Sequence, residues 1–203
     1  MSKPVVVIGA GGHAKVVIAA LRAAGRQVIG CAVRDVADAH GNVLGVPLVS
    51  EDALPPGVEL ILGTGDNRLR QRLAAKLPGP WTTCVHPAAT VAFGAVIGPG
   101  SVVCAGAVVQ PDVRLGAYVI VNTCASVDHD SVIADLAHIA PGAHLAGDVQ
   151  VGQGALVGVG AAIIPGRRVG AWTTVGAGAA VVTDVPDGAT VVGVPARPIT
   201  KRS

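Results

Sequence analysis

His129 lies between two aspartates, Asp128 and Asp130, in the stretch VDHDSVIADLAHIAPGAHLAGDVQ that spans residues 127–150. A carboxylate beside an imidazole can orient the ring and stabilise its protonated form. Such a pair can remove a proton from a substrate near neutral pH. The arrangement makes His129 a candidate general base, and a polar contact at an interface between subunits is the alternative interpretation.

A six-residue repeat must position this histidine. Stepping by six from Val85 to Val181 gives seventeen positions, and each of them is Val, Ile or Leu. Between them lie glycine-rich triplets such as GPG, GQG and GAG, where glycine turns the chain without steric cost. The period indicates short strands with alternating inward and outward residues, joined at tight corners. A register of this length is typical of a repeat architecture.

The repeat resembles the left-handed parallel β-helix of the hexapeptide-repeat acyltransferases. That resemblance implies the handedness and a triangular coil of three hexads, and such coils stack at roughly 4.8 Å. On this coil His129 lies at a corner, whereas His138 lies in the middle of a strand on the opposite face. One chain therefore cannot bring the two imidazoles together, but they could meet across a boundary between chains.

Every third hexad contributes the outward residues of one face of the coil. One face suits solvent: Val96, Arg114, Val132, Gln150 and Arg168. The second is an apolar stripe with a histidine in it: Val102, Ile120, His138, Leu156 and Thr174. The third carries mostly small residues: Val108, Ser126, His144, Ala162 and Ala180. Exposed apolar stripes usually mark interfaces, so we expect a homotrimer that buries the second and third faces, with His144 as a surface or interface residue.

The first eighty residues follow a different pattern. KPVVVIGAGGHAKVVIAALRAAG predicts a strand, a glycine loop and a helix, and Gly9, Gly11 and Ala14 fit the GxGxx[GA] spacing of dinucleotide sites. Asp35 follows a second strand, and ELILGTGDNRLRQRL adds a third strand, a second glycine turn and a helix. An NAD site is one interpretation, although this length supplies only half of a doubly wound sheet.

A second resemblance is more specific. The segment NTCASVDHDSVIADLAHIAPGAHLAG, followed by GVPARPI, resembles the acetyltransferases that act on nucleotide-activated amino sugars, as in the bacillosamine pathway. The sialic acid O-acetyltransferases share the same layout. The resemblance covers nearly the whole chain, including the small domain ahead of the β-helix.

In that family the histidine of this corner is the proposed general base. The resemblance therefore implies that His129 is the base and Asp130 its acidic partner, with Asp in place of the commoner and longer Glu. It also implies that His138 and the backbone amide of Gly147 lie near the thioester carbonyl of acetyl-CoA. For the nucleotide sugar it implies a site in the N-terminal domain, with His13 near the diphosphate or sugar and Asp35 facing the base or ribose: Gly9, Gly11, Gly12, His13, Asp35 and Gly65.

These observations divide the chain into three parts. We expect an α/β, half-Rossmann-like domain that binds the nucleotide sugar (1–82), an all-β left-handed parallel β-helix that binds acetyl-CoA and carries the catalytic residues (83–181), and a C-terminal tail (182–203). The expected reaction is direct acetyl transfer to a sugar amine, since no Cys or Ser beside the base suggests an acyl-enzyme. O-acetylation of a sugar such as sialic acid and a non-catalytic, nucleotide-binding scaffold are the alternatives.

Composition argues against several other classes. The 203 residues carry a net charge of +2, which gives no reason to expect a nucleic-acid partner. No apolar run is long enough, and free enough of charge and turn residues, to predict a membrane span. Four cysteines form no CxxC pair and predict neither zinc nor a disulfide framework: Cys31, Cys84, Cys104 and Cys124. We expect no metal cofactor, and a reducing cytoplasm is the simplest setting.

Overall fold

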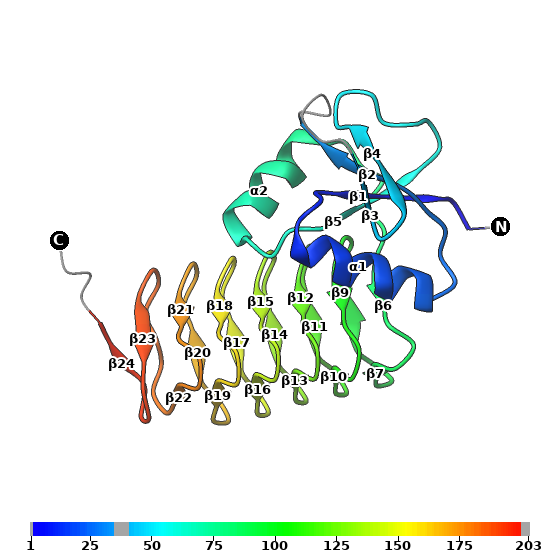
Figure 1. The fold of residues 1–203 in the computed structure, drawn as a ribbon. Coiled ribbons are helices and arrows are strands. Elements are labelled where there is room, and N and C mark those ends of the chain that lie inside the picture. Colours follow the sequence, from blue (N-terminus) through cyan, green and yellow to red (C-terminus); the bar gives the residue numbers. More distant parts are fainter. Residues whose placement is uncertain (1, 35–40, 200–203) are drawn as a thin grey trace.

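The computed structural model describes residues 2–34 and 41–199, and it consists of an α/β domain beside a long β-solenoid (Figure 1). The α/β domain contains a five-stranded sheet in the order β3-β4-β2-β1-β5. Its strands are β1 (Val5–Ile8), β2 (Val28–Val33), β3 (Asn42–Val43), β4 (Val46–Ser50) and β5 (Glu59–Leu62). Neighbouring strands pair in parallel except β3 with β4. This confirms the half of a doubly wound sheet, while Asp35 lies outside the described residues.

Two helices complete this domain, α1 (Gly12–Ala23) and α2 (Asn67–Lys76). Helix α2 begins after Asp66, whose carboxylate accepts a hydrogen bond from the Leu69 amide at 2.6 Å. Helix α1 has the apolar spacing of an amphipathic helix, and its buried residues include Ala14, Val17, Ile18 and Leu21.

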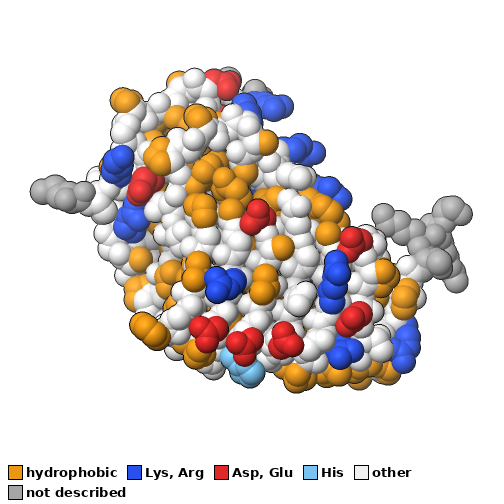
Figure 2. Space-filling model, turned by 180° about the vertical axis from the view of Figure 1, so that it is seen from behind, with side chains coloured by type: hydrophobic (Ala, Val, Ile, Leu, Met, Phe, Trp, Pro, Cys, Tyr) orange, Lys and Arg blue, Asp and Glu red, His pale blue; other side chains and the backbone are white. Residues whose placement is uncertain are grey.

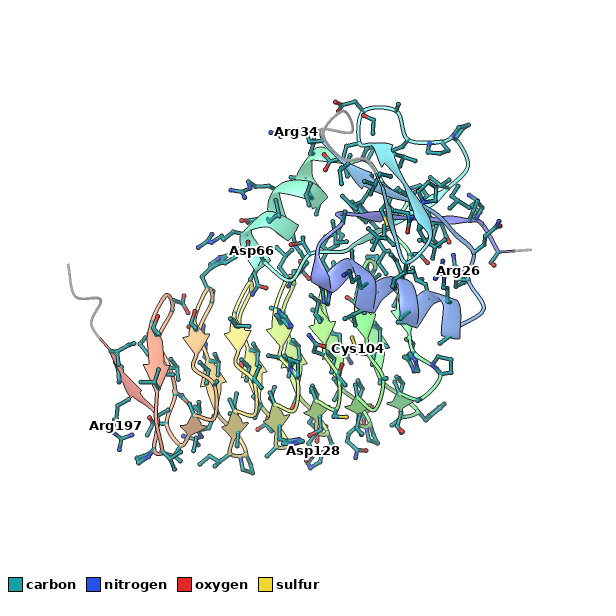
Figure 3. The ribbon with its side chains drawn as sticks, in the orientation of Figure 1. Arg26, Arg34, Asp66, Cys104, Asp128 and Arg197 are labelled. Atoms are coloured by element: carbon teal, nitrogen blue, oxygen red, sulfur yellow. The ribbon has the colours of Figure 1, made fainter. Side chains whose placement is uncertain are left out.

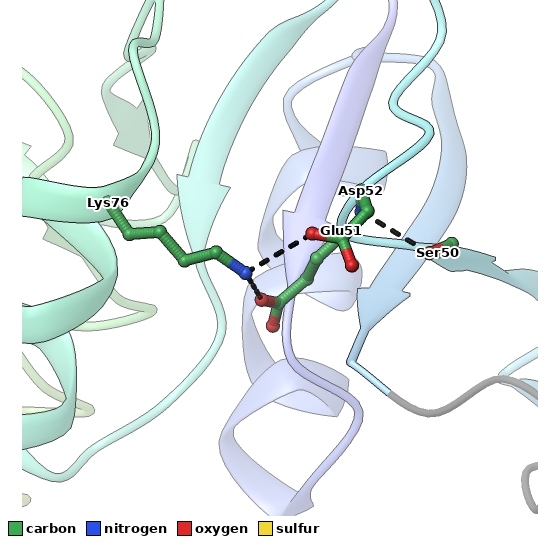
Figure 4. A network of polar contacts seen from close by, with 4 residues as sticks. All are labelled: Ser50, Glu51, Asp52 and Lys76. Carbon is green, nitrogen blue, oxygen red and sulfur yellow. Dashed lines mark hydrogen bonds and ion pairs between the residues drawn. The ribbon is translucent and has the colours of Figure 1, made fainter.

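The carboxyl end of α2 is tied to the segment that follows β4 (Figure 4). Lys76 Nζ lies 3.1 Å from Glu51 Oε2 and 3.4 Å from Asp52 Oδ1, and the Asp52 amide donates to Ser50 Oγ at 3.2 Å. Exposed ion pairs of this kind contribute at most about 1 kcal/mol each. The network therefore helps to orient α2, but burial of apolar side chains provides most of the domain's stability.

The solenoid consists of two-residue strands in three parallel sheets, one for each face. The first face contains β8 (Val96–Ile97), β11 (Arg114–Leu115), β14 (Val132–Ile133), β17 (Gln150–Val151) and β20 (Arg168–Val169). The second contains β6 (Cys84–Val85), β9 (Val102–Val103), β12 (Ile120–Val121), β15 (His138–Ile139), β18 (Leu156–Val157) and β21 (Thr174–Val175), extended by β23 (Thr190–Val192) and β24 (Arg197–Pro198). The third contains β7 (Thr90–Val91), β10 (Val108–Val109), β13 (Ser126–Val127), β16 (His144–Leu145), β19 (Ala162–Ile163) and β22 (Ala180–Val181).

The inward residues of the hexads form the solenoid core. Residues in equivalent positions pair with a step of 18, as Ile120 does with Val102 and with His138. This confirms the coil of three hexads. Aliphatic side chains stack in register inside the prism and are at most 2% exposed: Val109, Val127, Leu145 and Ile163. Each layer is one strand thick and is filled by aliphatic side chains, which is consistent with an aromatic content of only 2%.

The α/β domain covers the first part of the apolar stripe on the second face. Val102 and Ile120 are only 2% and 1% exposed, and Val102 shares a buried cluster with α1. These contacts lie within one chain. They correct the expectation that the whole stripe faces a neighbouring subunit, because the chain's own N-terminal domain already fills that role for its first coils. Leu156 and Thr174 lie further along and border cavities instead.

The segment after residue 181 adds to the solenoid. Strand β23 (Thr190–Val192) pairs in parallel with β21, and β24 (Arg197–Pro198) pairs with β23 in antiparallel fashion. An antiparallel strand cannot be followed by another coil in the same register. Residues 182–199, expected to form a tail, therefore close the open end of the prism.

Candidate active site

His129 and Asp130 form a hydrogen-bonded pair at the corner between β13 and β14. His129 Nδ1 lies 2.8 Å from Asp130 Oδ2, and both side chains are more than half exposed. A carboxylate only accepts, so Nδ1 carries the proton and Nε2 presents a lone pair to solvent. The hydrogen bond to Asp130 raises the pKa of His129, and the charges of Asp130, Asp128 and Asp148 act in the same direction. The shorter Asp arm is thus long enough to orient the ring.

The backbone conformation of this corner lets two consecutive residues, His129 and Asp130, pair through their side chains. Asp130 has a φ of 62°, in the left-handed region that corner residues of this prism adopt repeatedly. Viewed from behind, acidic side chains and an exposed histidine gather along one edge of the solenoid (Figure 2). Asp128, labelled in Figure 3, lies on the edge of the prism away from the α/β domain.

Gly147, one coil after His129, lies against the His129 ring. A Cβ at this position would lie 2.5 Å from His129 Cε1 and 2.6 Å from Nε2, a distance that real Cβ atoms do not adopt. The Asp148 amide, one residue later, donates to the His129 carbonyl at 2.9 Å. Glycine is therefore required so that the imidazole can lie flat against the next coil.

His138 lies beneath the α/β domain in a different environment. The Thr123 amide donates to Asn122 Oδ1 at 2.8 Å, which fixes the orientation of the Asn122 amide. Asn122 Nδ2 then faces His138 Nε2 at 3.0 Å, so that Nε2 must accept. The proton consequently lies on Nδ1, which donates to the Gly65 carbonyl at 3.3 Å. Burial, followed by the charge of Arg70 and then His13, lowers the pKa of His138 to about 4.

His13 joins this buried group from the other domain. Its ring centroid lies 6.2 Å from that of His138. Burial, with a smaller contribution from Arg70, lowers its pKa to about 4. Its Nε2 is buried and has no hydrogen-bond partner among the described residues. Both imidazoles are therefore neutral at physiological pH.

The glycine residues singled out in the sequence lie around one cavity, here named the glycine pocket. It has a volume of about 330 Å³, and its lining includes Gly9, Gly11, Gly12, His13 and Gly65. Gly11 and Gly12 form the amino end of α1, where unpaired backbone N–H groups favour an anion such as a phosphate. The structure thus brings together five of the six residues expected to bind a nucleotide sugar, and Asp35 is the one outside the described residues.

A second cavity follows the second face of the solenoid and is named the face cavity. It has a volume of about 500 Å³ and is bordered mainly by apolar residues, with His138 and Gly65 at one end and Leu156 and Val159 along its length. Gly65 therefore lines both cavities. Its position between them makes it the common wall of two compartments.

Sequence reasoning overlooked Asn122 and Arg70. Asn122 could have been noticed, because its equivalents in the following coils are Ala140, Gly158 and Gly176, so that a buried amide stands out. Arg70 gives no comparable signal, since arginines on a helix such as α2 normally point to solvent.

Residues 2–34 and 41–199 contain no group of three or more His, Cys, Asp or Glu side chains arranged to hold a metal ion. No helix among them has both the length and the apolar character that crossing a membrane demands.

Known proteins are similar to this chain over nearly its whole length. Residues 4–77 match the family model described as the PglD N-terminal domain. A single-residue variant of perosamine N-acetyltransferase from Caulobacter crescentus, solved with CoA and GDP-perosamine, is 43% identical, with a TM-score of 0.92 and 99% of each chain covered. The acetyltransferase domain of PglB from Neisseria gonorrhoeae, solved with acetyl coenzyme A, is 39% identical, with a TM-score of 0.90 over 98% of this chain and 100% of that one.

A curated relative is consistent with both structures. The GDP-perosamine N-acetyltransferase of Escherichia coli O157:H7 is 36% identical over 126 residues, which is 60% of this chain and 57% of that protein. The match thus spans less than two thirds of that relative's length. Near-complete coverage by the solved structures at about 40% identity decides the assignment: the chain belongs to the family of hexapeptide-repeat N-acetyltransferases that carry a PglD-type N-terminal domain.

Proposed function

We propose that this protein transfers the acetyl group of acetyl-CoA to the amino group of a nucleotide-linked amino sugar. The observation that carries the proposal is the His129–Asp130 pair, an oriented base with an accessible Nε2 at an exposed corner. The relatives solved with CoA, acetyl-CoA or GDP-perosamine support the same substrates. Among nucleotide sugars, GDP-perosamine is the favoured acceptor.

The chemistry is a direct acyl transfer. The acceptor nitrogen attacks the thioester carbonyl carbon, a C–N bond forms, and the C–S bond then breaks to release CoA. His129 Nε2 takes the proton that the amine must lose, and Asp130 stabilises the resulting imidazolium through Nδ1. The raised pKa of His129 makes it a stronger base than a free histidine.

The negative charge on the thioester oxygen needs a hydrogen-bond donor in the transition state. The Gly147 amide is the better candidate of the two expected donors. Equivalent corners in other coils carry Pro111 and Pro165, which have no N–H, so the coil does not need this donor for its own structure. His138 has both ring nitrogens engaged, with Asn122 and with Gly65.

The placement of the two histidines favours a site shared between chains. His138 lies under the α/β domain, and His129 lies on the edge of the prism away from that domain. A second copy of the chain, with its corner against the first copy's second face, would bring His129 to the end of the face cavity. A homotrimer with such contacts would contain three sites of this kind.

An acceptor screen tests the proposal. Purified protein is incubated with acetyl-CoA and with GDP-perosamine, UDP-linked or dTDP-linked amino sugars, and release of the CoA thiol and the mass of the product are followed. We expect N-acetylation, fastest with GDP-perosamine. A GDP-sugar with a hydroxyl in place of the amine is the matched control and should not react. Preferential O-acetylation, or micromolar binding of NAD without binding of any nucleotide sugar, would overturn the assignment.

A further inference from the structure

Arg70 is buried at the junction of the two domains. It is 1% exposed, and among the described residues it is the only charged side chain classed as buried. It lies on α2, where its neighbour Arg72 is exposed. Burying a guanidinium is costly unless its N–H groups are satisfied, so its partners indicate what it is for.

Those partners are backbone carbonyls from three segments. Nη1 donates to Gly65 O at 2.9 Å, Nε donates to Tyr118 O at 3.3 Å, and Nη2 donates to Leu136 O at 2.5 Å. A longer bond from Nη2 reaches Ala137 O at 3.3 Å. Gly65 belongs to the α/β domain, whereas Tyr118 and Leu136 lie on successive coils of the solenoid. The planar fork of arginine thus ties a loop of one domain to two coils of the other.

The Gly65 carbonyl is the point where this contact meets the candidate site. It accepts from Arg70 Nη1 and from His138 Nδ1. Gly65 also lines both the glycine pocket and the face cavity. A displacement of this residue would therefore change both compartments together.

We propose that Arg70 is a positioning residue for both substrates, which holds the Gly65 wall between the nucleotide-sugar site and the acetyl-CoA site. The inference rests on the proposed function, because it assigns the glycine pocket to the nucleotide sugar and the face cavity to acetyl-CoA. Arg70 is not itself among the residues that line either cavity; it acts through Gly65 and, by the shared carbonyl, through His138.

The positive charge of Arg70 adds to this role. The guanidinium makes no ion pair with a carboxylate in the described part of the chain. Burial lowers its pKa to about 10, so it stays protonated at neutral pH. Burial, and after it this charge, lowers the pKa of the two nearby imidazoles and keeps them neutral. The charge also favours an anionic group, such as a diphosphate, in the adjacent glycine pocket.

Steady-state kinetics of the full-length Arg70→Lys variant test the proposal, with acetyl-CoA and GDP-perosamine as substrates. Lysine keeps the charge but cannot hold three segments with a fixed fork. We expect KM to rise for both substrates by about tenfold, the scale of one lost hydrogen bond to a charged group. The kcat should change much less, because the hydrogen-bond partners of Arg70 do not include His129, Asp130 or Gly147, the groups assigned to the chemistry. Simple loss of folded protein would instead lower the apparent kcat and leave KM unchanged.

Two control variants separate positioning from docking. Arg72→Met removes an exposed charge from the same helix and should leave both KM values unchanged. Asn67→Ala removes the bonds from Asn67 Nδ2 to Gly154 O and Ala155 O, which also join α2 to the solenoid but do not involve Gly65. It should lower Tm with little effect on KM.

If Arg70→Lys does not fold, Gly65→Ala tests the same wall. The added methyl would lie 3.7 Å from His138 Cε1, which is an ordinary contact, so the fold should tolerate it. Both KM values should rise. Unchanged KM values in Arg70→Lys or in Gly65→Ala would overturn the proposal, and so would a parallel rise in Asn67→Ala. A wild-type protein that turns over neither substrate would instead contradict the proposed function.

Discussion

His129 and His138 carry the same side chain in one solenoid, yet their surroundings differ in nearly every respect. His129 is exposed at a corner, and its hydrogen bond to Asp130 raises its pKa. His138 is covered by a second domain, and burial lowers its pKa to about 4. The place of a residue on the coil therefore decides its chemistry. The corner position suits the proposed base, and the covered face holds a neutral ring that links structural elements.

The largest effect should follow loss of the corner histidine. His129→Ala removes the proposed base, so kcat should fall by about 100-fold or more, the usual scale for general base catalysis. The KM for acetyl-CoA should change little, because the base contacts the acceptor. The exposed position predicts an unchanged Tm. A variant that retains more than half of the wild-type kcat would contradict the proposal that His129 is the general base.

Mixing chains of two variants, one at His129 and one at His138, sharpens the comparison further. If His129 and His138 serve one site from different chains, His129→Ala chains combined with His138→Ala chains should recover activity that neither has alone. The mixture must be refolded together or shown by mass spectrometry to exchange subunits. Verified mixed oligomers without activity would mean that the two residues do not share a site, and that His138 has a structural role.

The carboxylate partner should have a smaller effect, together with a shift in pH dependence. His129 acts as a base only when unprotonated, so the rate should fall as pH decreases through its raised pKa. Asp130→Asn removes the cause of that rise, and the acid limb should therefore move to lower pH. The plateau kcat should fall by about tenfold because a weaker, less well oriented base remains. A pH–rate profile that keeps its acid limb would show that Asp130 does not set this pKa.

The buried histidines predict an effect on the stability of the fold. His13 and His138 have pKa values lowered to about 4, whereas in an unfolded chain they titrate near 6.5. Between these values the unfolded state binds protons that the folded state does not. Their stabilising contribution is therefore present above pH 6.5 and is lost as pH falls toward 4, by about 3 kcal/mol for each residue.

Thermal unfolding measured between pH 6.5 and pH 4 tests whether stability falls with pH as predicted. His13→Gln should lose less Tm between pH 6.5 and pH 4 than the wild type does. His144→Gln, at an exposed position on the third face, is the matched control and should keep the wild-type slope. Equal slopes in all three proteins would contradict the assignment of a buried, neutral His13.

The repeat explains which parts could be predicted from the sequence. Each hexad carries its own strand and corner, so counting places His129 at a corner and His138 on a strand. The resemblance to a coil of three hexads then places them on opposite sides of the prism. The last coil does not follow the six-residue period because it is shorter. Val169 pairs with Val185 and Thr174 with Thr190, a step of 16 instead of 18. The six-residue register of Val, Ile and Leu therefore ends at Val181.

Contacts between the domains could not be predicted in the same way. The cover over Val102 and Ile120 comes from a domain without a repeat, so no period relates the two surfaces. The contact from Arg70 to Leu136 O joins residues 66 positions apart through a backbone carbonyl, which any residue type supplies. The identity of residue 136 therefore gives no sign of this bond.

The left-handed corner beside His129 recurs in the neighbouring coils. Asp112 and Asp148 have φ values of 61° and 57°, close to that of Asp130, so three successive layers carry an aspartate at this corner with the same left-handed backbone conformation. Only the imidazole and the glycine above it single out the middle layer. A histidine introduced at 147, with glycine at 165, would relocate the proposed base by one strand spacing, about 4.8 Å along the prism axis. The repeat thus allows the distance between the glycine pocket and the proposed base to be changed in steps of one coil without redesigning the fold.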